Sequence, residues 1–274
     1  MATRKMATAL GEVAFDYGAQ YFTARDPHFR HLVDKWHALN IVEPWPLVAA
    51  DAWVGRPGMN AIVQHMAAAH TVSWGHRVTG MIRYDRLWRL MSEAGAMGPF
   101  DSVILAIPAE QAATILAIHD FSMARIALMA RSQPCWTSMF VFDRLLQELP
   151  SIFRTSGDIA WAARNSAKPG RSGPETWVLQ ANASWSDART DLARDDIGTA
   201  LHAALSDTTG CVIPEPIAAM SHLWRYALSA GTGDGALWKP ELGLGVCGDW
   251  LLGPRVECAW LSGKCLAESI ARDT

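Results

Sequence analysis

The sequence predicts an α/β fold in which two domains share the chain by alternation. Its 274 residues, 50% of them hydrophobic and 19% charged, can bury a substantial core in one large domain or in two interleaved ones. The order of the helix-like and strand-like segments along the chain suggests this sharing. The run 100–108 is almost continuously apolar, which is typical of a strand in a parallel sheet.

The composition argues against several classes of protein. A formal net charge of -3 argues against nucleic acid as the main partner, because phosphate binding needs a basic surface. No run is long enough to span a membrane, and the first ten residues lack the apolar core of a secretory signal. The five cysteines form neither a C-x-x-C pair nor a zinc-type cluster, so we expect reduced thiols, no metal and a cytoplasmic protein.

The first part of the chain is predicted to be mixed. After an extended piece at 15–21, a helix is expected from Pro27 to Leu39, because Asp26 is a good N-cap residue and proline suits the first helical position. A turn then leads into a helix that ends near Ala68. Further strands are expected at 71–74, 77–82, 87–91 and 100–108, and a helix at 109–118.

The second part is richer in strands. Strands are predicted at 135–143, 159–165, 176–183 and 220–227, a helix at 195–205, and a loop at 168–174 that is rich in glycine and proline.

The C-terminal segment gives the most specific local signal. An apolar strand from Leu242 ends on Gly248 and Asp249, and a Gly253–Pro254 turn precedes an amphipathic helix. A carboxylate beside a helix N-terminus combines an acceptor for hydroxyls with free N–H groups, which suits a flavin dinucleotide. The alternative is an ordinary strand–turn–helix with an incidental aspartate.

A set of short motifs carries a resemblance over most of the chain. These motifs lie at 1–4, 15–23, 53–59, 103–108, 134–136, 161–170, 224–227 and 245–250. Together they resemble the renalase-like flavoprotein oxidoreductases, relatives of the monoamine-oxidase type of flavin enzyme. The resemblance implies an α/β fold with an FAD-binding Rossmann-like domain, N-terminally incomplete, interleaved with a mixed-sheet α+β substrate domain. The implied boundaries are 1–21, 54–118 and 218–274 for the FAD-binding domain, and 22–53 and 119–217 for the substrate domain.

The sequence departs from this family at its start. The family opens with a βαβ unit that carries G-x-G-x-x-G and an acidic residue, whereas Met1 here belongs to the stretch that follows that unit. Gly231–Gly235 lacks the strand before it and the helix after it that a substitute needs. We expect a start assigned too late or a truncated copy. The rival expectation is a separate N-terminal fragment that supplies the unit. Without it, affinity for the cofactor should fall by several orders of magnitude.

The resemblance implies a set of residues around FAD. The loop at 18–21 would approach the ring edge, Asp249 would accept from ribityl hydroxyls, and the N–H groups at the following helix start would face the N1–C2=O region. Each position also has a purely structural reading, as a turn, sheet core or first-turn helix acid. The full set of expected cofactor contacts is Arg4, Gly18, Ala19, Gln20, Tyr21, Pro57, Gly58, Met59, Val78, Gly248, Asp249, Val256 and Glu257.

The expected substrate contacts are mainly aromatic. Strand alternation puts His222, Trp224 and Tyr226 on one side of their strand, where they would stack a planar substrate or else pack on the core. Trp161 and Asn165 are further candidates, and no catalytic residue is assigned. We expect FAD to take hydride from a small dihydronicotinamide-like substrate and dioxygen to act as acceptor. The alternatives are an amine oxidase, or a silent or partner-dependent chain that does not hold FAD alone.

Overall fold

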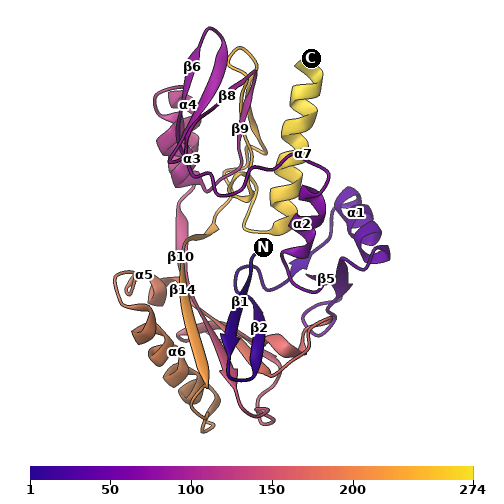
Figure 1. The fold of residues 1–274 in the computed structure, drawn as a ribbon, viewed down its shortest axis with the longest axis vertical. Coiled ribbons are helices and arrows are strands. Elements are labelled where there is room, and N and C mark those ends of the chain that lie inside the picture. The colour runs from indigo at the N-terminus through magenta and orange to yellow at the C-terminus, as the bar shows by residue number, and fades with distance from the viewer. Residues whose placement is uncertain (274) are drawn as a thin grey trace. The chain divides into compact units, whose positions relative to one another are not determined.

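The computed structural model describes residues 1–273 of the chain. These residues form two compact units, each built from two separate segments (Figure 1). Unit 1 comprises residues 1–69 and 133–227, and unit 2 comprises residues 70–132 and 228–274. The domain boundaries expected from the sequence differ from these divisions and stay a prediction. Each unit is described by itself.

Unit 1 contains a hairpin, two sheets and several helices. Its strands are β1 (Thr3–Thr8), β2 (Gly11–Asp16), β3 (Phe22–Thr23), β4 (Val42–Pro44), β5 (Ala52–Gly55), β10 (Ser132–Phe142), β11 (Ile152–Phe153), β12 (Ile159–Arg164), β13 (Glu175–Ala181) and β14 (Ala218–Ser229). Its helices are α1 (Pro27–Ala38), α2 (Ala61–Ala67), η1 (Asn165–Ala167), α5 (Ala183–Asp187) and α6 (Arg194–Thr209).

The larger sheet of unit 1 is covered on both faces. Its strand order is β11-β12-β13-β10-β14. On one face Phe140 packs in a core with Leu201 of α6, and on the other Met139 packs with Phe15 of the β1–β2 hairpin. Because both faces are covered, β10 is buried continuously from Cys135 to Phe142. The hairpin thereby brings the end of β2 into the interior.

A smaller sheet lies beside helix α1. Its order is β3-β5-β4, and all four residues of β5 are buried. Helix α1 begins where the sequence predicts, because the Asp26 side chain accepts hydrogen bonds from the N–H groups of His28 and Phe29. Its apolar side is buried. The predicted helix at 27–39 is confirmed.

Unit 2 contains two three-stranded sheets and the long C-terminal helix. Its strands are β6 (Val78–Tyr84), β7 (Leu87–Ser92), β8 (Gly95–Phe100), β9 (Val103–Leu105), β15 (Leu237–Lys239) and β16 (Leu244–Val246). Its helices are α3 (Ala109–Leu116), α4 (Phe121–Met129), η2 (Asp249–Leu251) and α7 (Val256–Asp273). The sheet orders are β6-β7-β8 and β15-β16-β9.

Two strand predictions in unit 2 were wrong, one altogether and one in extent. No strand forms at 71–74, where every side chain is exposed and no neighbouring strand pairs with the run. The predicted strand at 100–108 is reduced to β9, because Phe100 ends the antiparallel strand β8. Pairing of β9 with β16 is parallel, as predicted, but Ile104 is 40% exposed, so β9 is buried on one face only.

The remaining predicted elements are present with shifted ends. The predicted strands near 77–82, 87–91, 135–143, 159–165, 176–183 and 220–227 and the predicted helices near 61–68, 109–118, 195–205 and after 255 all form. The sequence analysis missed helix α4, which begins after Asp120, whose side chain accepts from the N–H of Met123. Among residues 1–273, no helix combines the length and apolarity needed to cross a bilayer.

Candidate functional site

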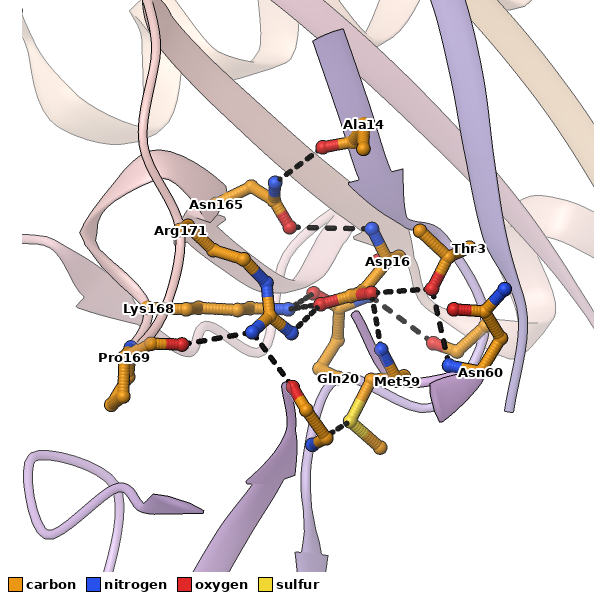
Figure 2. A network of polar contacts seen from close by, with 12 residues as sticks. Thr3, Ala14, Asp16, Gln20, Met59, Asn60, Asn165, Lys168, Pro169 and Arg171 are labelled. Atoms are coloured by element: carbon orange, nitrogen blue, oxygen red, sulfur yellow. Dashed lines mark hydrogen bonds and ion pairs between the residues drawn. The ribbon is translucent and has the colours of Figure 1, made fainter. Parts of the chain in front are cut away.

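A buried carboxylate organises the candidate site of unit 1. Asp16 ends β2 and is 1% exposed. One of its oxygens, Oδ1, accepts from Thr3 Oγ1 and from the backbone N–H of Met59, each at 2.8 Å. The other, Oδ2, forms ion pairs with Arg171 and with Lys168, whose Nζ lies at 3.6 Å (Figure 2). Burial alone would raise the pKa of Asp16, but the two cations hold it below its usual value.

Lys168 brings a second cation into the same interior. Its side chain is 0% exposed, and its Nζ donates to Gln20 Oε1 at 3.0 Å. The Nζ also lies 5.5 Å from the centroid of the Trp45 ring. Burial lowers the pKa of Lys168 to about 8, although the charge of Asp16 partly opposes this shift.

The loop at 17–21 is held by side chains rather than by a backbone ladder. The Gln20 amide donates to the carbonyls of Asp16 at 2.5 Å and of Gly18 at 3.1 Å, and the Gln180 amide donates to Gly18 at 2.9 Å. Within residues 1–273, no protein acceptor pairs with the backbone N–H groups of Gly18, Ala19 or Gln20. The loop therefore offers consecutive donors to a ligand. Its contact with a cofactor stays a prediction.

An aromatic cluster lies at the start of this loop. The rings of Tyr17, His222 and Trp224 are in contact, with centroids 4.5 to 5.2 Å apart. Trp224 Nε1 donates to the carbonyl of Tyr17 at 2.9 Å, and a Cβ on Gly18 would lie 3.5 Å from the Trp224 ring. Arg4 also belongs here, because its Cζ lies 5.9 Å from the Tyr17 ring centroid. The predicted side-by-side placement of His222 and Trp224 on β14 is confirmed.

The environment of His222 lowers its pKa and so favours the neutral imidazole. Burial is the main reason for its lowered pKa, and the charges of Arg4 and Arg194 lower it further. Its Nδ1 is buried, with no hydrogen-bond partner among the described residues. A neutral imidazole with one unused nitrogen can accept or donate a hydrogen bond, depending on its tautomer.

A second aromatic cluster lies at the end of the loop. The Tyr21 and Trp161 ring centroids are 5.5 Å apart, and Trp45 lies 6.4 Å from each. Arg154 Cζ lies 4.8 Å from the Trp161 ring, and its Nη2 donates to the Tyr21 hydroxyl at 2.6 Å. Arg154 and Trp161 line a cavity of about 330 Å³. The full lining is Leu47, Val48, Pro150, Ser151, Ile152, Phe153, Arg154 and Trp161.

The predicted turn at Pro57–Met59 packs against the start of the chain. A Cβ on Gly58 would lie 2.8 Å from Thr3 Oγ1, so only glycine fits without a shift. Met59 is fully buried, and its N–H reaches Asp16. The turn, the 1–4 stretch and the 17–21 loop thus meet at one carboxylate. A larger cavity of about 540 Å³ elsewhere in unit 1 contains none of the predicted site residues.

Two predicted substrate residues have other surroundings. The Asn165 side chain is buried, its oxygen accepts from the Asp16 N–H at 3.3 Å, and its amide donates to the carbonyl of Ala14 at 2.9 Å. These bonds use it to hold β2. Tyr226 is 41% exposed near the end of β14. Their substrate roles stay predictions.

The remaining predicted cofactor contacts lie in unit 2. β16 and β9 run parallel, and Asp249 follows at their carboxyl ends. Gly248 donates its N–H to Ser262 Oγ at 3.0 Å, which ties the strand end to α7. Burial raises the pKa of Asp249, although hydrogen bonds from the backbone N–H groups of Trp250 and of Asp249 itself oppose the shift.

Helix α7 begins at Val256, as predicted, beside this turn. The carboxylate of Glu257 is 2% exposed and pairs with Arg255 at 2.9 Å. Val78 opens β6 opposite Ser92. Residues 243–248 read G-x-G-x-x-G, but they lie along and just after β16 instead of between a strand and a helix start, so they form no phosphate loop.

Unit 1 therefore contains the first eight predicted cofactor contacts, and three of the five predicted substrate residues, Trp161, His222 and Trp224, lie in its two aromatic clusters. Unit 2 holds the other five predicted cofactor contacts. Sequence reasoning missed Asp16, Lys168 and Arg171. Lys168 lies in a motif that carries the resemblance, but no site residue was assigned in the loop at 168–174. A local pattern gives no sign that the cations of this loop meet a carboxylate 152 and 155 residues away. In the described part of the chain, no group of His, Cys, Asp and Glu side chains is arranged to hold a metal ion.

Comparison with known proteins identifies the family. The family described as flavin containing amine oxidoreductase matches residues 37–270, which is most of the chain. The chain belongs to this family, and FAD is the cofactor that the family implies.

Solved structures share the fold. A protein from Exiguobacterium sp. 255-15 with a provisional assignment as a protoporphyrinogen oxidase superposes with a TM-score of 0.64 at 16% identity, over 82% of this chain and 53% of its own. Cyclohexylamine oxidase from Brevibacterium oxydans IH-35A gives 0.59 at 14% identity, over 82% of this chain and 55% of its own. An oxidoreductase from Methanosarcina mazei gives 0.57 at 16% identity, over 80% of this chain and 56% of its own. The chain spans a little over half the length of these proteins.

Proposed function

We propose that this member of the flavin-containing amine oxidoreductase family takes hydride from a small dihydronicotinamide-like substrate and passes the electrons to dioxygen. The observation that carries the proposal is the loop at 17–21. This loop presents unpaired N–H groups between two aromatic clusters. The buried ionic network of Asp16, Lys168 and Arg171 holds the loop through the Gln20 side chain.

The residues present fit a flavin. In unit 1, the unpaired N–H groups of Gly18 and Ala19 suit carbonyl or nitrogen acceptors of a planar ring. In unit 2, taken by itself, the partly exposed carboxylate of Asp249 at the ends of parallel strands suits hydroxyls such as those of a ribityl chain. Bound FAD would supply the hydride acceptor. The protein would supply orientation, exclusion of water and a fixed electrostatic field.

The aromatic clusters favour a planar substrate without positive charge. Arg154 lies over Trp161 and Tyr21, and Lys168 lies beside Trp45, so cations already lie against the rings that would otherwise attract an ammonium group. A protonated amine would add a further positive charge to this wall. This observation supports renalase-like specificity over the amine-oxidase alternative.

The proposed roles divide between positioning and binding. Trp161, Trp224 and His222 would contact the substrate ring, and no side chain in either aromatic cluster is needed to remove a proton if hydride transfers directly. The lowered pKa of His222 agrees with this, because a neutral imidazole would act as a hydrogen-bonding group without adding charge.

The test uses the full 274-residue chain. Bound FAD is measured after reconstitution, and flavin bleaching is followed without oxygen on adding 6-dihydro-NAD, NADH or cyclohexylamine. The proposal expects bleaching by 6-dihydro-NAD and hydrogen peroxide when air is admitted. Asp249→Ala should weaken FAD binding about tenfold, which corresponds to one hydrogen bond of about 1.4 kcal/mol.

Each competing function gives a different result. Bleaching by cyclohexylamine alone would support an amine oxidase and contradict the proposal. A chain that stays colourless with excess FAD would support the silent or partner-dependent alternative.

A further inference from the structure

The Lys168 side chain is fully buried beside a carboxylate that already has another cation as its partner. Its ammonium is shared among Gln20 Oε1 at 3.0 Å, Asp16 Oδ2 at 3.6 Å and the Trp45 ring at 5.5 Å. Arg171 already pairs with Asp16, so the carboxylate does not need a second cation. A lysine is almost never fully buried unless it is paired, and here the oxygen of Gln20, at 3.0 Å, lies closer to the ammonium than the carboxylate does.

The ammonium determines how the Gln20 amide is oriented. An ammonium group only donates hydrogen bonds, so Gln20 must turn its oxygen toward Lys168. Its NH₂ group then faces the carbonyls of Asp16 and Gly18, to which it donates. Gly18 thus receives one donor from Gln20 and one from Gln180. Figure 2 shows the Lys168 side chain reaching this network from the loop that follows η1.

We propose that Lys168 is a positioning residue of the flavin site, which holds the Gln20 amide and thereby keeps the backbone at 18–20 in the conformation that leaves its N–H groups free for the cofactor. The identity of the ligand rests on the proposed function. The hold on the loop is a property of the chain itself and can be measured without FAD.

The charge of Lys168 gives the proposal a distinctive signature. Hydrogen bonds from a charged donor are roughly twice as strong as neutral ones. The charged groups that contact the ammonium are Asp16, which favours its charge, and Arg171, which opposes it, while burial lowers its pKa to about 8. Raising the pH through this value should loosen the loop. The same deprotonation relieves a buried charge, so it should stabilise the fold as a whole.

The experiment measures two properties of the full chain. Hydrogen exchange of peptides covering 16–22 is followed at pH 7 and 9.5 after correction for intrinsic rates. The reporting amides are those of Asp16 and Tyr17, which donate to Asn165 Oδ1 and to the carbonyl of Ala2, because the unpaired amides at 18–20 exchange without opening. FAD affinity is measured by flavin fluorescence. The variants are Lys168→Met, Gln20→Ala, the double variant, and Lys35→Met, an exposed lysine of α1, as matched control. Each single change at the site should speed exchange and weaken FAD binding about tenfold, as expected for one charge-assisted hydrogen bond.

The double variant tests the route through Gln20. If Lys168 acts through that amide, Lys168→Met should add little to Gln20→Ala. If the effects of the two single changes multiply in the double variant, Lys168 does not act through Gln20. If the loop of Lys168→Met exchanges at the wild-type rate, the proposal itself is wrong. In the wild type, faster loop exchange at pH 9.5 is expected, and equal exchange at both pH values would contradict it even if Lys168→Met fails to fold.

Failure of the proposed function can be told apart from failure of this inference. A wild-type chain that binds no FAD but shows the expected exchange pattern would refute the flavin function and retain the hold on the loop. A chain that binds FAD with equal affinity in wild type and Lys168→Met would retain the function and refute the positioning role.

Discussion

Asp16 pairs with two buried cations, so its charge should matter more than that of any surface carboxylate in unit 1. Asp16→Asn keeps the shape but places an amide against Lys168 and Arg171, whose side chains are 0% and 7% exposed. Removing one partner of a buried ionic group is expected to lower the free energy of unfolding by about 3–5 kcal/mol. Urea denaturation at pH 7 measures the change.

The chain offers a matched control for this substitution. Asp51 pairs with Arg25 at 2.8 Å, but its side chain is 30% exposed. Asp51→Asn should therefore lower the free energy of unfolding by less than about 1 kcal/mol. Equal losses in the two variants would show that burial of the Asp16 network adds nothing to stability.

At this scale the sequence predicted residues by their local context. Gly18 to Tyr21 and Gly58 were named as cofactor contacts through the family resemblance of the motifs that contain them, and these contacts stay predictions. Lys168 and Arg171 were missed because an ion pair between residues more than 150 positions apart leaves no local pattern. Their burial arises only when the loop after η1 folds over the end of β2.

At the scale of elements, the turn from β16 to α7 depends on Gly248. Its φ of 166° is extended backbone that any residue can adopt, so the constraint is space. A Cβ there would lie 2.7 Å from Trp250 Nε1, which donates to the carbonyl of Ile107 at 3.1 Å. Gly248→Ala should therefore displace the buried indole and lower the free energy of unfolding by about 1–3 kcal/mol.

For Gly263, in the same unit, we expect a change to alanine to increase stability. It lies inside α7, and a Cβ there would meet nothing within 4 Å. Gly263→Ala should raise the free energy of unfolding by about 0.5–1 kcal/mol, because alanine favours the helix. Thermal unfolding followed by circular dichroism compares the two variants, and a loss in both would contradict this account.

Elements with clear caps and periodicity were predicted well. Helix α1 has an aspartate cap and a proline start, and it forms where these signals place it. The apolar run at 100–108 was wrongly predicted as one strand, because hydrophobicity alone does not show where one strand ends and another with a different partner begins. Its first residue pairs with β7 and its middle with β16. The run at 71–74 has strand-like residues but no neighbouring strand to pair with.

At the scale of the whole molecule, the buried lysine predicts how stability changes with pH. Lys168 has a pKa of about 8 in the folded chain and an ordinary value of 10.5. Between these values the unfolded chain binds more protons, so the contribution of Lys168 to stability rises with pH across this window. The difference in unfolding free energy between wild type and Lys168→Met should rise by about 3 kcal/mol from pH 7 to 10.5.

Urea denaturation of both proteins at several pH values measures this difference, and the comparison removes the contribution of groups that titrate equally in both. A difference that stays constant from pH 7 to 10.5 would mean that the lysine keeps an ordinary pKa when folded.

The family was the part of the whole molecule that the sequence predicted best. Short motifs spread over most of the chain indicated a flavin oxidoreductase, and the family match over residues 37–270 confirms that class. The grouping of residues into units was not predicted in the same form. Contacts within each unit connect segments from distant parts of the chain, and local patterns do not report such pairings.

The network at Asp16 also constrains the order of folding. Its members come from residues 3, 16, 20, 59, 168 and 171, and a ribosome makes the first four more than 100 residues before the last two. During synthesis the Asp16 carboxylate stays hydrated until Lys168 and Arg171 have been made. Contacts of such wide sequence separation form slowly, because a long loop must close before they contribute. We therefore expect the 17–21 loop to be among the last parts of unit 1 to become ordered in a nascent chain.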